Sequence, residues 1–431
     1  MGAHKTRIGM TIALLCALPA LAHAKDMFFN DESHRLPADS FNPPLTDTLA
    51  VLLTDLDGDK DLDIFLVQGT SSLDGRQNRI LINDGRGNFS DETTTRLPQA
   101  MNNSAGADAA DIDRDGDIDI IVANLGPEQL LLNDGRGRFT DVSAARLPPP
   151  LTNVMEDISA EARFFDVDRD GDLDILVGNE NPFSRNPLGG AQNRLWINDG
   201  HGRFADETAA RLPSITDQTA AFAFGDIDGD GDGDLVVANA GQDRVLINNG
   251  RGVFTDETAA RFPALSDASR DAKLGDVDGD GKLDLFVVNS RAQQNRLYFN
   301  NGRGVFTDVT SARLPVPLDT SNGLALADLD GDGDLDAYIA NSGPFLRDAH
   351  DFAGEQNRLY LNNGHGRFRD KTLKYSPPLA DPSTGVAVGD INGDGLPDIL
   401  VTNSGANNGA ERLYIQVRKR DKVKALDTDE D

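Results

Sequence analysis

Seven Asp-rich nonapeptides recur along the chain and constrain its fold more than any other feature. The fullest copy runs from Asp328 to Asp336 and reads Asp-Leu-Asp-Gly-Asp-Gly-Asp-Leu-Asp. The copies, numbered here as loops 1 to 7, begin at Asp55, Asp111, Asp166, Asp226, Asp276, Asp328 and Asp390, so the separations are 56, 55, 60, 50, 52 and 62 residues. A period of this length predicts an array of structural repeats.

The residue types predict a cation site in every loop. Positions 1, 3, 5 and 9 carry a carboxylate in all copies, except that Asn392 occupies position 3 of loop 7. Neighbouring carboxylates repel one another, whereas oxygen ligands at alternate positions of a tight loop suit Ca²⁺, which takes about six to eight oxygens. We expect position 7 to add its backbone carbonyl, and up to seven Ca²⁺ ions to bind. The predicted ligands are Asp55, Asp57, Asp59, Asp61 and Asp63; Asp111, Asp113, Asp115, Asp117 and Asp119; Asp166, Asp168, Asp170, Asp172 and Asp174; Asp226, Asp228, Asp230, Asp232 and Asp234; Asp276, Asp278, Asp280, Lys282 and Asp284; Asp328, Asp330, Asp332, Asp334 and Asp336; and Asp390, Asn392, Asp394, Leu396 and Asp398.

Positions 6 and 12 distinguish these loops from an EF-hand. Position 6 is Gly in six copies, as a loop folding back on an ion requires, but it is Lys60 in loop 1, which we therefore expect to be the weakest site. An EF-hand needs a bidentate acid at position 12 and flanking helices. Position 12 is apolar in every copy and lies in β-branched runs such as Ile118 to Ala123, which predict strands. The ion is thus expected between two strands.

Each repeat contains the pattern of four strands. A strand rich in small residues, such as Gly385 to Gly389, precedes the Asp-rich loop, and two more strands follow before an Asn-Asp-Gly or Asn-Asn-Gly turn. Such turns favour hairpins. The Phe after each turn is expected in the core. Seven four-stranded units arranged radially predict an all-β, seven-bladed β-propeller with the small-residue strand innermost.

The seventh repeat lacks a fourth strand after Glu411 to Ile415, and the N-terminal region supplies a candidate. Met27 to Pro37 resembles Gly202 to Pro213 with one residue deleted. We therefore predict that the N-terminal segment forms the outer strand of the last blade. This pairing closes the ring and removes an exposed edge.

Residues 1–24 have the pattern of a secretory signal peptide, with Lys5 and Arg7, an apolar run, and Ala22-His-Ala24. We expect an exported, periplasmic or secreted protein, with residues 25–417 forming one propeller domain and 418–431 a charged, disordered tail. The only Cys lies in the leader, and no later run is long enough for a membrane span. Cleavage leaves 39 basic and 71 acidic side chains, a net charge of −32. This charge argues against nucleic acid as a partner.

The motif pair Asp-x-Asp-x-Asp-Gly-x-x-Asp and Asn-x-Gly-x-Gly-x-Phe-x-Asp resembles the FG-GAP or VCBS repeat family, which includes the propeller of integrin α subunits and many secreted bacterial proteins. The resemblance covers residues 25 to 417. It implies a seven-bladed propeller with Ca²⁺ in the loop between the first and second strands of a blade. Lys60 departs from the family pattern, and we expect no extra domain after the seventh copy. Since the family shares no single activity, function must be argued from a site.

Three functions remain open. The first is a non-enzymatic, Ca²⁺-stabilised binding or adhesion module for a protein or glycan; the second is a lectin with pockets between blades; the third is a polysaccharide-active enzyme. Motifs for a nucleophile elbow, a zinc protease or a phosphate loop do not occur, which argues against catalysis. We expect a monomer whose partner binds the face opposite the Ca²⁺ loops, where long insertions carry Phe183, Arg185, Phe345, Arg347 and Phe352.

Overall fold

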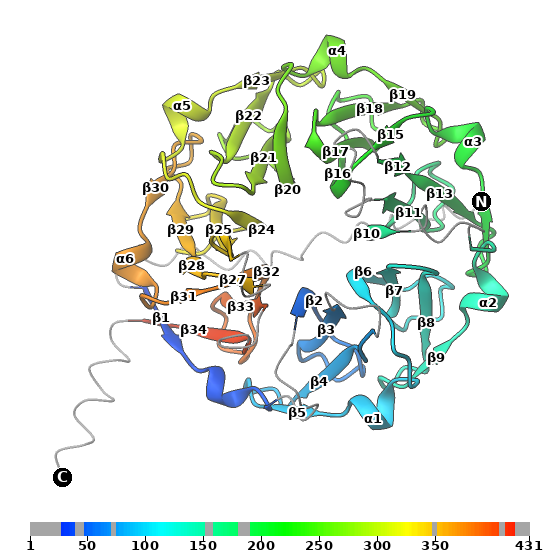
Figure 1. Cartoon of the computed structure of the whole chain (residues 1–431), viewed down its shortest axis with the longest axis horizontal. Helices are drawn as coiled ribbons and strands as arrows, with labels where there is room; N and C mark the ends of the chain where they lie inside the picture. Colours follow the sequence, from blue (N-terminus) through cyan, green and yellow to red (C-terminus); the bar gives the residue numbers. More distant parts are fainter. Residues whose placement is uncertain are drawn as a thin grey trace, which may run out of the picture.

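Seven antiparallel blades form a closed ring, as the sequence predicted (Figure 1). The computed structural model describes residues 27–38, 47–69, 75–150, 158–179, 190–346, 351–404 and 410–418. Five blades are separate four-stranded sheets, and blades 4 and 5 share an eight-stranded sheet because the end of one strand of blade 4 pairs with the first strand of blade 5.

The strands of each blade follow one another from the axis outward. Blade 1 is β2 (Asp47–Thr54), β3 (Asp63–Gly69), β4 (Arg79–Asn83) and β5 (Phe89–Asp91). Blade 2 is β6 (Ser104–Ala110), β7 (Asp119–Asn124), β8 (Gln129–Asn133) and β9 (Phe139–Asp141). Blade 3 is β10 (Ser159–Phe165), β11 (Asp174–Asn179), β13 (Arg194–Asn198) and β14 (Phe204–Asp206). Blade 4 is β16 (Thr219–Gly225), β17 (Asp234–Gly241), β18 (Arg244–Asn248) and β19 (Phe254–Asp256).

The remaining blades repeat this order. Blade 5 is β20 (Asp267–Gly275), β21 (Asp284–Asn289), β22 (Arg296–Asn300) and β23 (Phe306–Asp308). Blade 6 is β24 (Ser321–Ala327), β25 (Asp336–Asn341), β29 (Arg358–Leu361) and β30 (Arg369–Asp370). Blade 7 is β32 (Ser383–Gly389), β33 (Asp398–Asn403), β34 (Arg412–Arg418) and β1 (Met27–Asp31).

The innermost strands are the small-residue strands, as predicted. They contact one another around the ring, and residues of all seven line an axial cavity of about 420 Å³. The second strands are buried on both faces, which explains their continuous β-branched runs. Seven apolar clusters, each shared by two adjacent blades, form the core. The Phe after each turn is buried, for example Phe306 at 4% exposure, so its predicted core role is confirmed.

The N-terminal strand completes blade 7. Strand β1 pairs antiparallel with β34, with Met27 opposite Arg418 and Asp31 opposite Tyr414. Met27 and Phe29 are buried in the cluster shared by blades 6 and 7. The predicted closure is therefore confirmed.

Short helices follow the outer strands and were not predicted from the sequence. They are η1 (Ser33–Arg35), α1 (Thr93–Arg96), α2 (Ser143–Arg146), α3 (Thr208–Arg211), α4 (Thr258–Arg261), α5 (Thr310–Arg313) and α6 (Thr372–Tyr375). At about one turn each they are too short to give a periodic signal, and Figure 1 places them on the rim. Within the described residues, no helix is long and apolar enough to cross a membrane.

Short pairings join neighbouring blades at the end of the ring where the second and third strands connect. They are β12 (Ala191–Gln192) with β15 (Thr216–Asp217), and β28 (Glu355–Gln356) with β31 (Ala380–Asp381). A further hairpin, β26 (Phe345–Leu346) with β27 (Asp351–Phe352), lies within blade 6. At the same end, the residue that precedes a third strand bonds a hydroxyl on the inner strand of the next blade. Asn78 donates to Ser104 (3.1 Å), Asn295 to Ser321 (3.1 Å) and Asn357 to Ser383 (3.0 Å).

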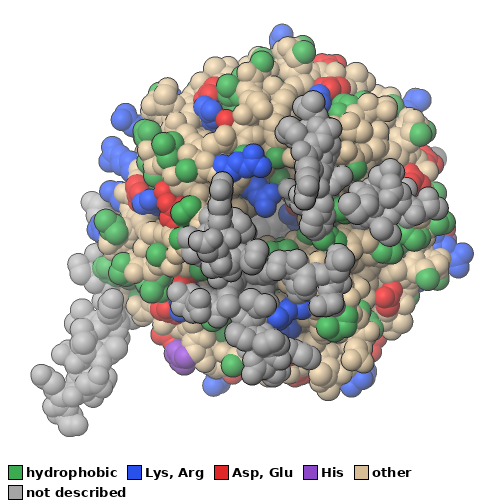
Figure 2. Space-filling model, in the orientation of Figure 1, with side chains coloured by type: hydrophobic (Ala, Val, Ile, Leu, Met, Phe, Trp, Pro, Cys, Tyr) green, Lys and Arg blue, Asp and Glu red, His purple; other side chains and the backbone are tan. Residues whose placement is uncertain are grey.

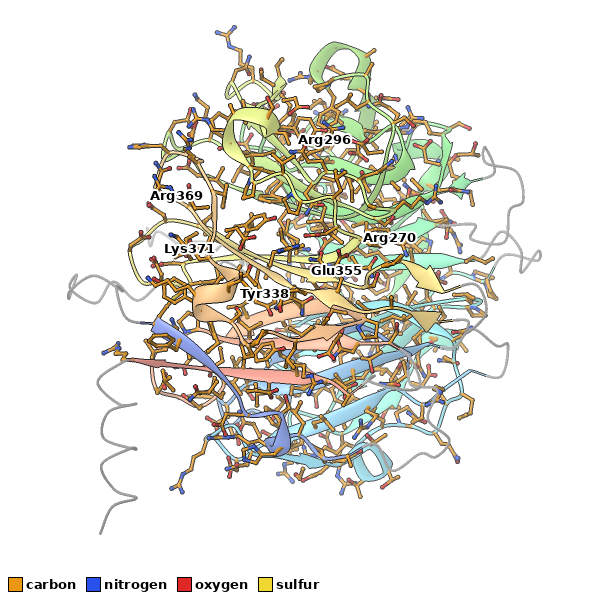
Figure 3. The ribbon with its side chains drawn as sticks, turned by 60° about the vertical axis from the view of Figure 1, so that its left-hand side comes forward. Arg270, Arg296, Tyr338, Glu355, Arg369 and Lys371 are labelled. Carbon is orange, nitrogen blue, oxygen red and sulfur yellow. The ribbon has the colours of Figure 1, made fainter. Side chains whose placement is uncertain are left out.

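Blade 4 has a carboxylate at this position, which makes its interface sensitive to pH. Asp243 is 5% exposed; it accepts the backbone N–H of Asn239 (2.9 Å) and the hydroxyl of Ser269 (3.1 Å). Burial raises the pKa of Asp243 to about 7, although Arg296 (Figure 3) partly opposes this shift. Because the folded-state pKa exceeds the unfolded one, the folded state is favoured by protonation. The contribution of Asp243 to the unfolding free energy is fully present below about pH 4. It is lost as the pH rises to about 7.

We predict that Asp243→Asn stabilises the protein at alkaline pH, because an amide can keep both hydrogen bonds without a buried charge. The gain in unfolding free energy should grow by on the order of 2 kcal/mol between pH 5 and pH 8. Urea unfolding at several pH values measures it. The reverse substitution Asn295→Asp at the equivalent position of blade 5 should show the opposite trend. A gain that does not change with pH would contradict the prediction.

Candidate metal centres

All seven Asp-rich loops lie at one end of the ring, which we call the metal face. Each loop joins the inner strand of a blade to the second strand, and in blades 1 to 6 the Asn-x-Gly turn between the third and fourth strands packs against it. Such crowding follows from a four-stranded meander, in which these two connections share one end. The second-to-third connections and the connections between blades lie at the other end, which we call the opposite face.

The backbone of each loop wraps around the position 1 carboxylate. In loop 1, Asp55 accepts the N–H groups of Gly58 (2.8 Å) and Lys60 (3.0 Å). Lys60 has a φ of 80°, in the left-handed region that glycine occupies at position 6 of the other loops. The loop thus keeps its shape at Lys60, at the conformational cost of a side chain in this region. Position 4 needs the same conformation, which the sequence did not indicate for Arg114 and Arg169, each with a φ of 65°.

The position 9 carboxylate is buried and holds the loop to its turn. In loop 1, Asp63 is 0% exposed and accepts the N–H groups of Leu56 (3.0 Å) and Asn83 (2.9 Å). Burial raises the pKa of Asp63 to about 6 and the pKa values of Asp174 and Asp336 to about 8. A cation at the loop would favour the ionised form and oppose this shift.

Carboxylate oxygens converge in the loops. Ligand atoms lie within 4.8 Å of one another in the sets Asp55, Asp57 and Asp63; Asp111, Asp113 and Asp115; Asp166, Asp168 and Asp174; Asp226, Asp228 and Asp230; and Asp276, Asp278 and Asp284. This spacing suits an ion that binds oxygen at about 2.4 Å, since opposite ligands then lie about 4.8 Å apart. Both the identity and the spacing of these side chains fit a hard divalent cation.

Unpaired oxygens at position 3 provide an independent test of this fit. The Oδ1 atoms of Asp57, Asp113, Asp168, Asp228 and Asp330 are buried and make no hydrogen bond. A buried carboxylate oxygen without a partner is costly. The same atom is unpaired in five blades, so the residues present fit a bound cation.

Side chains at position 7 point away from the clusters. A Cβ on Gly85, Gly135 or Gly250 would collide with the carboxylate of Asp61, Asp117 or Asp232, so these side chains lie over the turn of their own blade. Arg114 and Arg169 pair with Asp172 and Asp232 in the next blade. The arrangement leaves the backbone carbonyl, rather than the side chain, as the group that position 7 can offer.

The first Asn of each turn has a second role that the sequence did not reveal. Asn83 donates to the carbonyl of Leu62 in its own loop (3.0 Å) and to that of Ile391 in the loop of the preceding blade (2.8 Å). Asn133, Asn198, Asn248, Asn300 and Asn362 make the same pairs of bonds. In blade 7, Gln416 reaches Leu329 (2.8 Å). Each turn therefore links two neighbouring metal loops.

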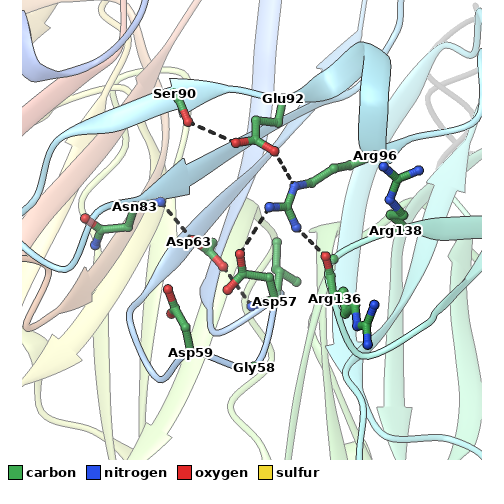
Figure 4. Close-up of polar contacts among 12 residues, drawn as sticks. Asp57, Gly58, Asp59, Asp63, Asn83, Ser90, Glu92, Arg96, Arg136 and Arg138 are labelled. Carbon is green, nitrogen blue, oxygen red and sulfur yellow. Dashed lines mark hydrogen bonds and ion pairs between the residues drawn. The ribbon is translucent and has the colours of Figure 1, made fainter.

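An Arg at the end of the rim helix also reaches the metal face, and sequence reasoning missed it. Arg96 contacts Glu92 through Nε (2.6 Å), Asp57 through Nη2 (3.2 Å) and the carbonyl of Arg136 in blade 2 (Figure 4). Arg146, Arg211 and Arg261 make the equivalent contacts with Asp113, Asp168 and Asp228. The available signal was the recurrence of Arg before Leu-Pro or Phe-Pro, which occurs six times in the chain.

The predicted partner-binding residues are largely outside the described part of the chain. Phe183, Arg185 and Arg347 are not described, and Phe345 and Phe352 are described only in the backbone of β26 and β27. Both strands belong to the connection between the second and third strands of blade 6, which is on the opposite face.

The fold and the loops together define a closed seven-bladed propeller with an Asp-rich loop at the same end of every blade. A family model described as an FG-GAP-like repeat matches residues 55–122, 111–177, 166–237, 226–287, 276–339 and 348–401. The chain therefore belongs to the FG-GAP-like repeat family.

Two solved structures match the chain at low sequence identity. The structure of BBS1N in complex with ARL6DN matches with a TM-score of 0.50 and 15% identity, over 88% of this chain and 97% of that one. A lectin from Agrocybe aegerita, described as recognising non-reducing terminal N-acetylglucosamine, matches with a TM-score of 0.47 and 20% identity, over 77% of this chain and 82% of that one. A search of curated sequences found no match.

Proposed function

We propose that the protein is an exported, non-enzymatic binding module that uses Ca²⁺ to hold its metal face rigid and binds a protein or glycan on the opposite face. The buried, unpaired Oδ1 atoms at position 3 are the observation that carries the metal assignment. Bound Ca²⁺ would neutralise the carboxylates and cross-link positions 1, 3, 5, 7 and 9 of each loop.

The two faces differ in a way that favours recognition on the opposite face. On the metal face, every loop has nine residues, and Asn and Arg side chains tie it to its neighbours. The second-to-third connections differ widely in length, from Gln242–Asp243 in blade 4 to the region between β25 and β29 in blade 6. Variable loops on a rigid scaffold are where recognition residues tend to lie.

A screen of the Ca²⁺-loaded protein against glycans and candidate proteins tests the proposal. The double variant Phe183→Ala/Phe345→Ala should then reduce binding of the ligand found, with an unchanged melting temperature. Loss of stability with intact binding would place these side chains in loop packing and refute their role in recognition. Turnover of an acidic polysaccharide would refute the non-enzymatic assignment.

A second candidate function, a lectin, is supported by a pocket on the opposite face. A polar pocket of about 400 Å³ lies between the connections of blades 3, 4 and 5. Its lining includes the exposed side chains of Thr216, Ser266 and Arg291 and the amide of Gln242. Hydroxyl, amide and guanidinium groups around a concave site suit a polyhydroxylated ligand.

The Arg291 rim of this pocket has a strained backbone. Arg291 and Ala292 have φ values of 60° and 55°, and Gln293 N–H bonds the carbonyl of Ser290 (3.2 Å). This is a type I′ turn, which favours Asn-Gly. Figure 2 shows Lys and Arg side chains near the axis on the face in view.

We predict that Arg291→Asn/Ala292→Gly stabilises the protein by about 1 kcal/mol or more, because both residues then suit positive φ. Thermal unfolding measures the gain. If the pocket binds a glycan, the double variant should lose affinity for it because Arg291 is removed. The single variant Ala292→Gly should gain stability and keep the affinity for the glycan. An unchanged or lower melting temperature for both variants would contradict the assignment of strain.

A further inference from the structure

The seven metal loops differ in the cations that surround them. In loops 1 to 4, the rim-helix Arg pairs with the position 3 carboxylate at 3.1 to 3.3 Å. Loop 5 has Lys282, which pairs with Asp280 at 2.5 Å. Loop 7 has an amide, Asn392, in place of one acid.

Loop 6 has five carboxylates and no such cation. The rim-helix position that holds Arg in blades 1 to 5 holds Tyr375 in blade 6, and its neighbour Lys374 lies over the Tyr375 ring at 4.3 Å. Among the described residues, no Lys or Arg forms an ion pair with Asp328, Asp330, Asp332, Asp334 or Asp336. His365 lies near Asp334.

Comparison of loop 6 with the others separates two roles for the Arg. If the Arg oriented the position 3 carboxylate, the unpaired Oδ1 should be absent where the Arg is absent. Asp330 nevertheless has the same buried, unpaired Oδ1 as Asp57, Asp113, Asp168 and Asp228. The Arg is therefore not required for this orientation, and it is left with its charge and its bond to the next blade. In loop 5, which also lacks the Arg pair, Asp278 Oδ1 instead accepts the N–H of Asp280 at 3.2 Å.

We propose that Arg96, Arg146, Arg211 and Arg261 are built-in counter-charges that weaken cation binding at their own loops, which makes loop 6 the tightest site. The inference rests on the proposed Ca²⁺ binding. Each guanidinium lies against a carboxylate on the Oδ2 side and donates to a backbone carbonyl of the next blade, so it holds the interface when no ion is bound. An incoming divalent cation must then bind beside a positive charge.

Tb³⁺ luminescence tests the effect at the loops nearest the tryptophan. Trp196, the only tryptophan, pairs with Ile175 next to Asp174 of loop 3 and packs in the cluster that includes Ile112 of loop 2, so its excitation reports on loops 2 and 3. At pH 8, Arg211→Gln should lower the Tb³⁺ concentration at half-signal for loop 3 by about thirtyfold, the effect of one charge on a trivalent ion at ~6 Å in a water-like dielectric. Arg211→Lys, which keeps the charge, and Arg96→Gln, which acts on loop 1, should leave the midpoint unchanged.

Two further measurements complete the test. Arg114 is 57% exposed and pairs with Asp172 in loop 3, so Arg114→Gln should also tighten the Trp-sensitised signal without affecting the fold. In calorimetric Ca²⁺ titrations, Asp332→Ala in loop 6 should remove the tightest binding step, whereas Asp59→Ala at the same exposed position of loop 1 should keep it.

The outcomes distinguish this inference from the function on which it rests. The counter-charge role would be overturned, with metal binding intact, if the Tb³⁺ concentration at half-signal stayed the same or rose in both Arg211→Gln and Arg114→Gln. It would also be overturned if the tightest Ca²⁺ binding step were lost in Asp59→Ala and kept in Asp332→Ala. Absence of any Ca²⁺ or Tb³⁺ binding to the wild-type chain would overturn both. The counter-charge role would be supported if Arg211→Gln lowered the melting temperature, relative to the wild type, by more in chelator than in Ca²⁺.

Discussion

Removal of Ca²⁺ by a chelator is expected to lower the melting temperature of the protein sharply. If each site has a dissociation constant of about 0.1 mM, about 1 mM Ca²⁺ contributes on the order of 1.4 kcal/mol per independent site. Seven sites would then contribute roughly 10 kcal/mol, which is comparable to the total stability of a typical domain. Thermal unfolding with and without chelator measures this contribution, and an unchanged midpoint would contradict it.

Two controls separate the ion from other effects of the chelator. Chelator that is already saturated with Ca²⁺ should leave the melting temperature unchanged. Mg²⁺ should restore little of the loss, because it requires a small octahedral site and retains its water. Full recovery in Mg²⁺ would mean that general charge neutralisation, rather than coordination by the loops, stabilises the metal face.

Deletion of Met27 to Asp31 is expected to have an effect of similar size. The deletion removes the buried side chains of Met27 and Phe29, which are 3% and 5% exposed, and exposes the edge of β34. Loss of two such side chains costs more than about 5 kcal/mol, and an open edge promotes aggregation. Melting temperature and light scattering measure the two consequences.

A peptide spanning residues 27–38 provides the matching rescue. When it is added in trans, it should pair with β34 and restore part of the lost stability, whereas the same peptide with Phe29→Ser should not. A truncated protein that melts like the full chain and stays monomeric would show that β1 contributes little to ring closure.

The sequence predicted the features that depend on local pattern. The spacing of the Asp-rich loops gave the number of blades, small residues identified the inner strands, and the likeness of Met27–Pro37 to Gly202–Pro213 predicted the shared seventh blade. Each of these signals lies within one stretch of chain, and each was confirmed by the sheet order.

Contacts between blades could not be read in this way. Asn83 was assigned to a turn because turn chemistry explains it fully, yet its side chain also bonds Ile391 in another blade. Arg96 is the last residue of a one-turn helix too short for a periodic signal, and its partners Asp57 and Arg136 come from two different repeats. The pattern of a repeat shows what recurs, whereas such partners depend on how far one blade is rotated against the next.

The pairing of β1 with β34 also bears on how the protein is made. Met27 and its neighbour Gln416 are 389 residues apart in the chain. During synthesis, the segment Met27–Asp31 must wait unpaired until Arg412–Arg418 has been produced, and its apolar side chains are exposed for that time. A nascent chain that stops before Arg412 keeps both edges open, so completion of the ring acts as a check on chain length: only a full-length product hides the surface that chaperones and proteases recognise.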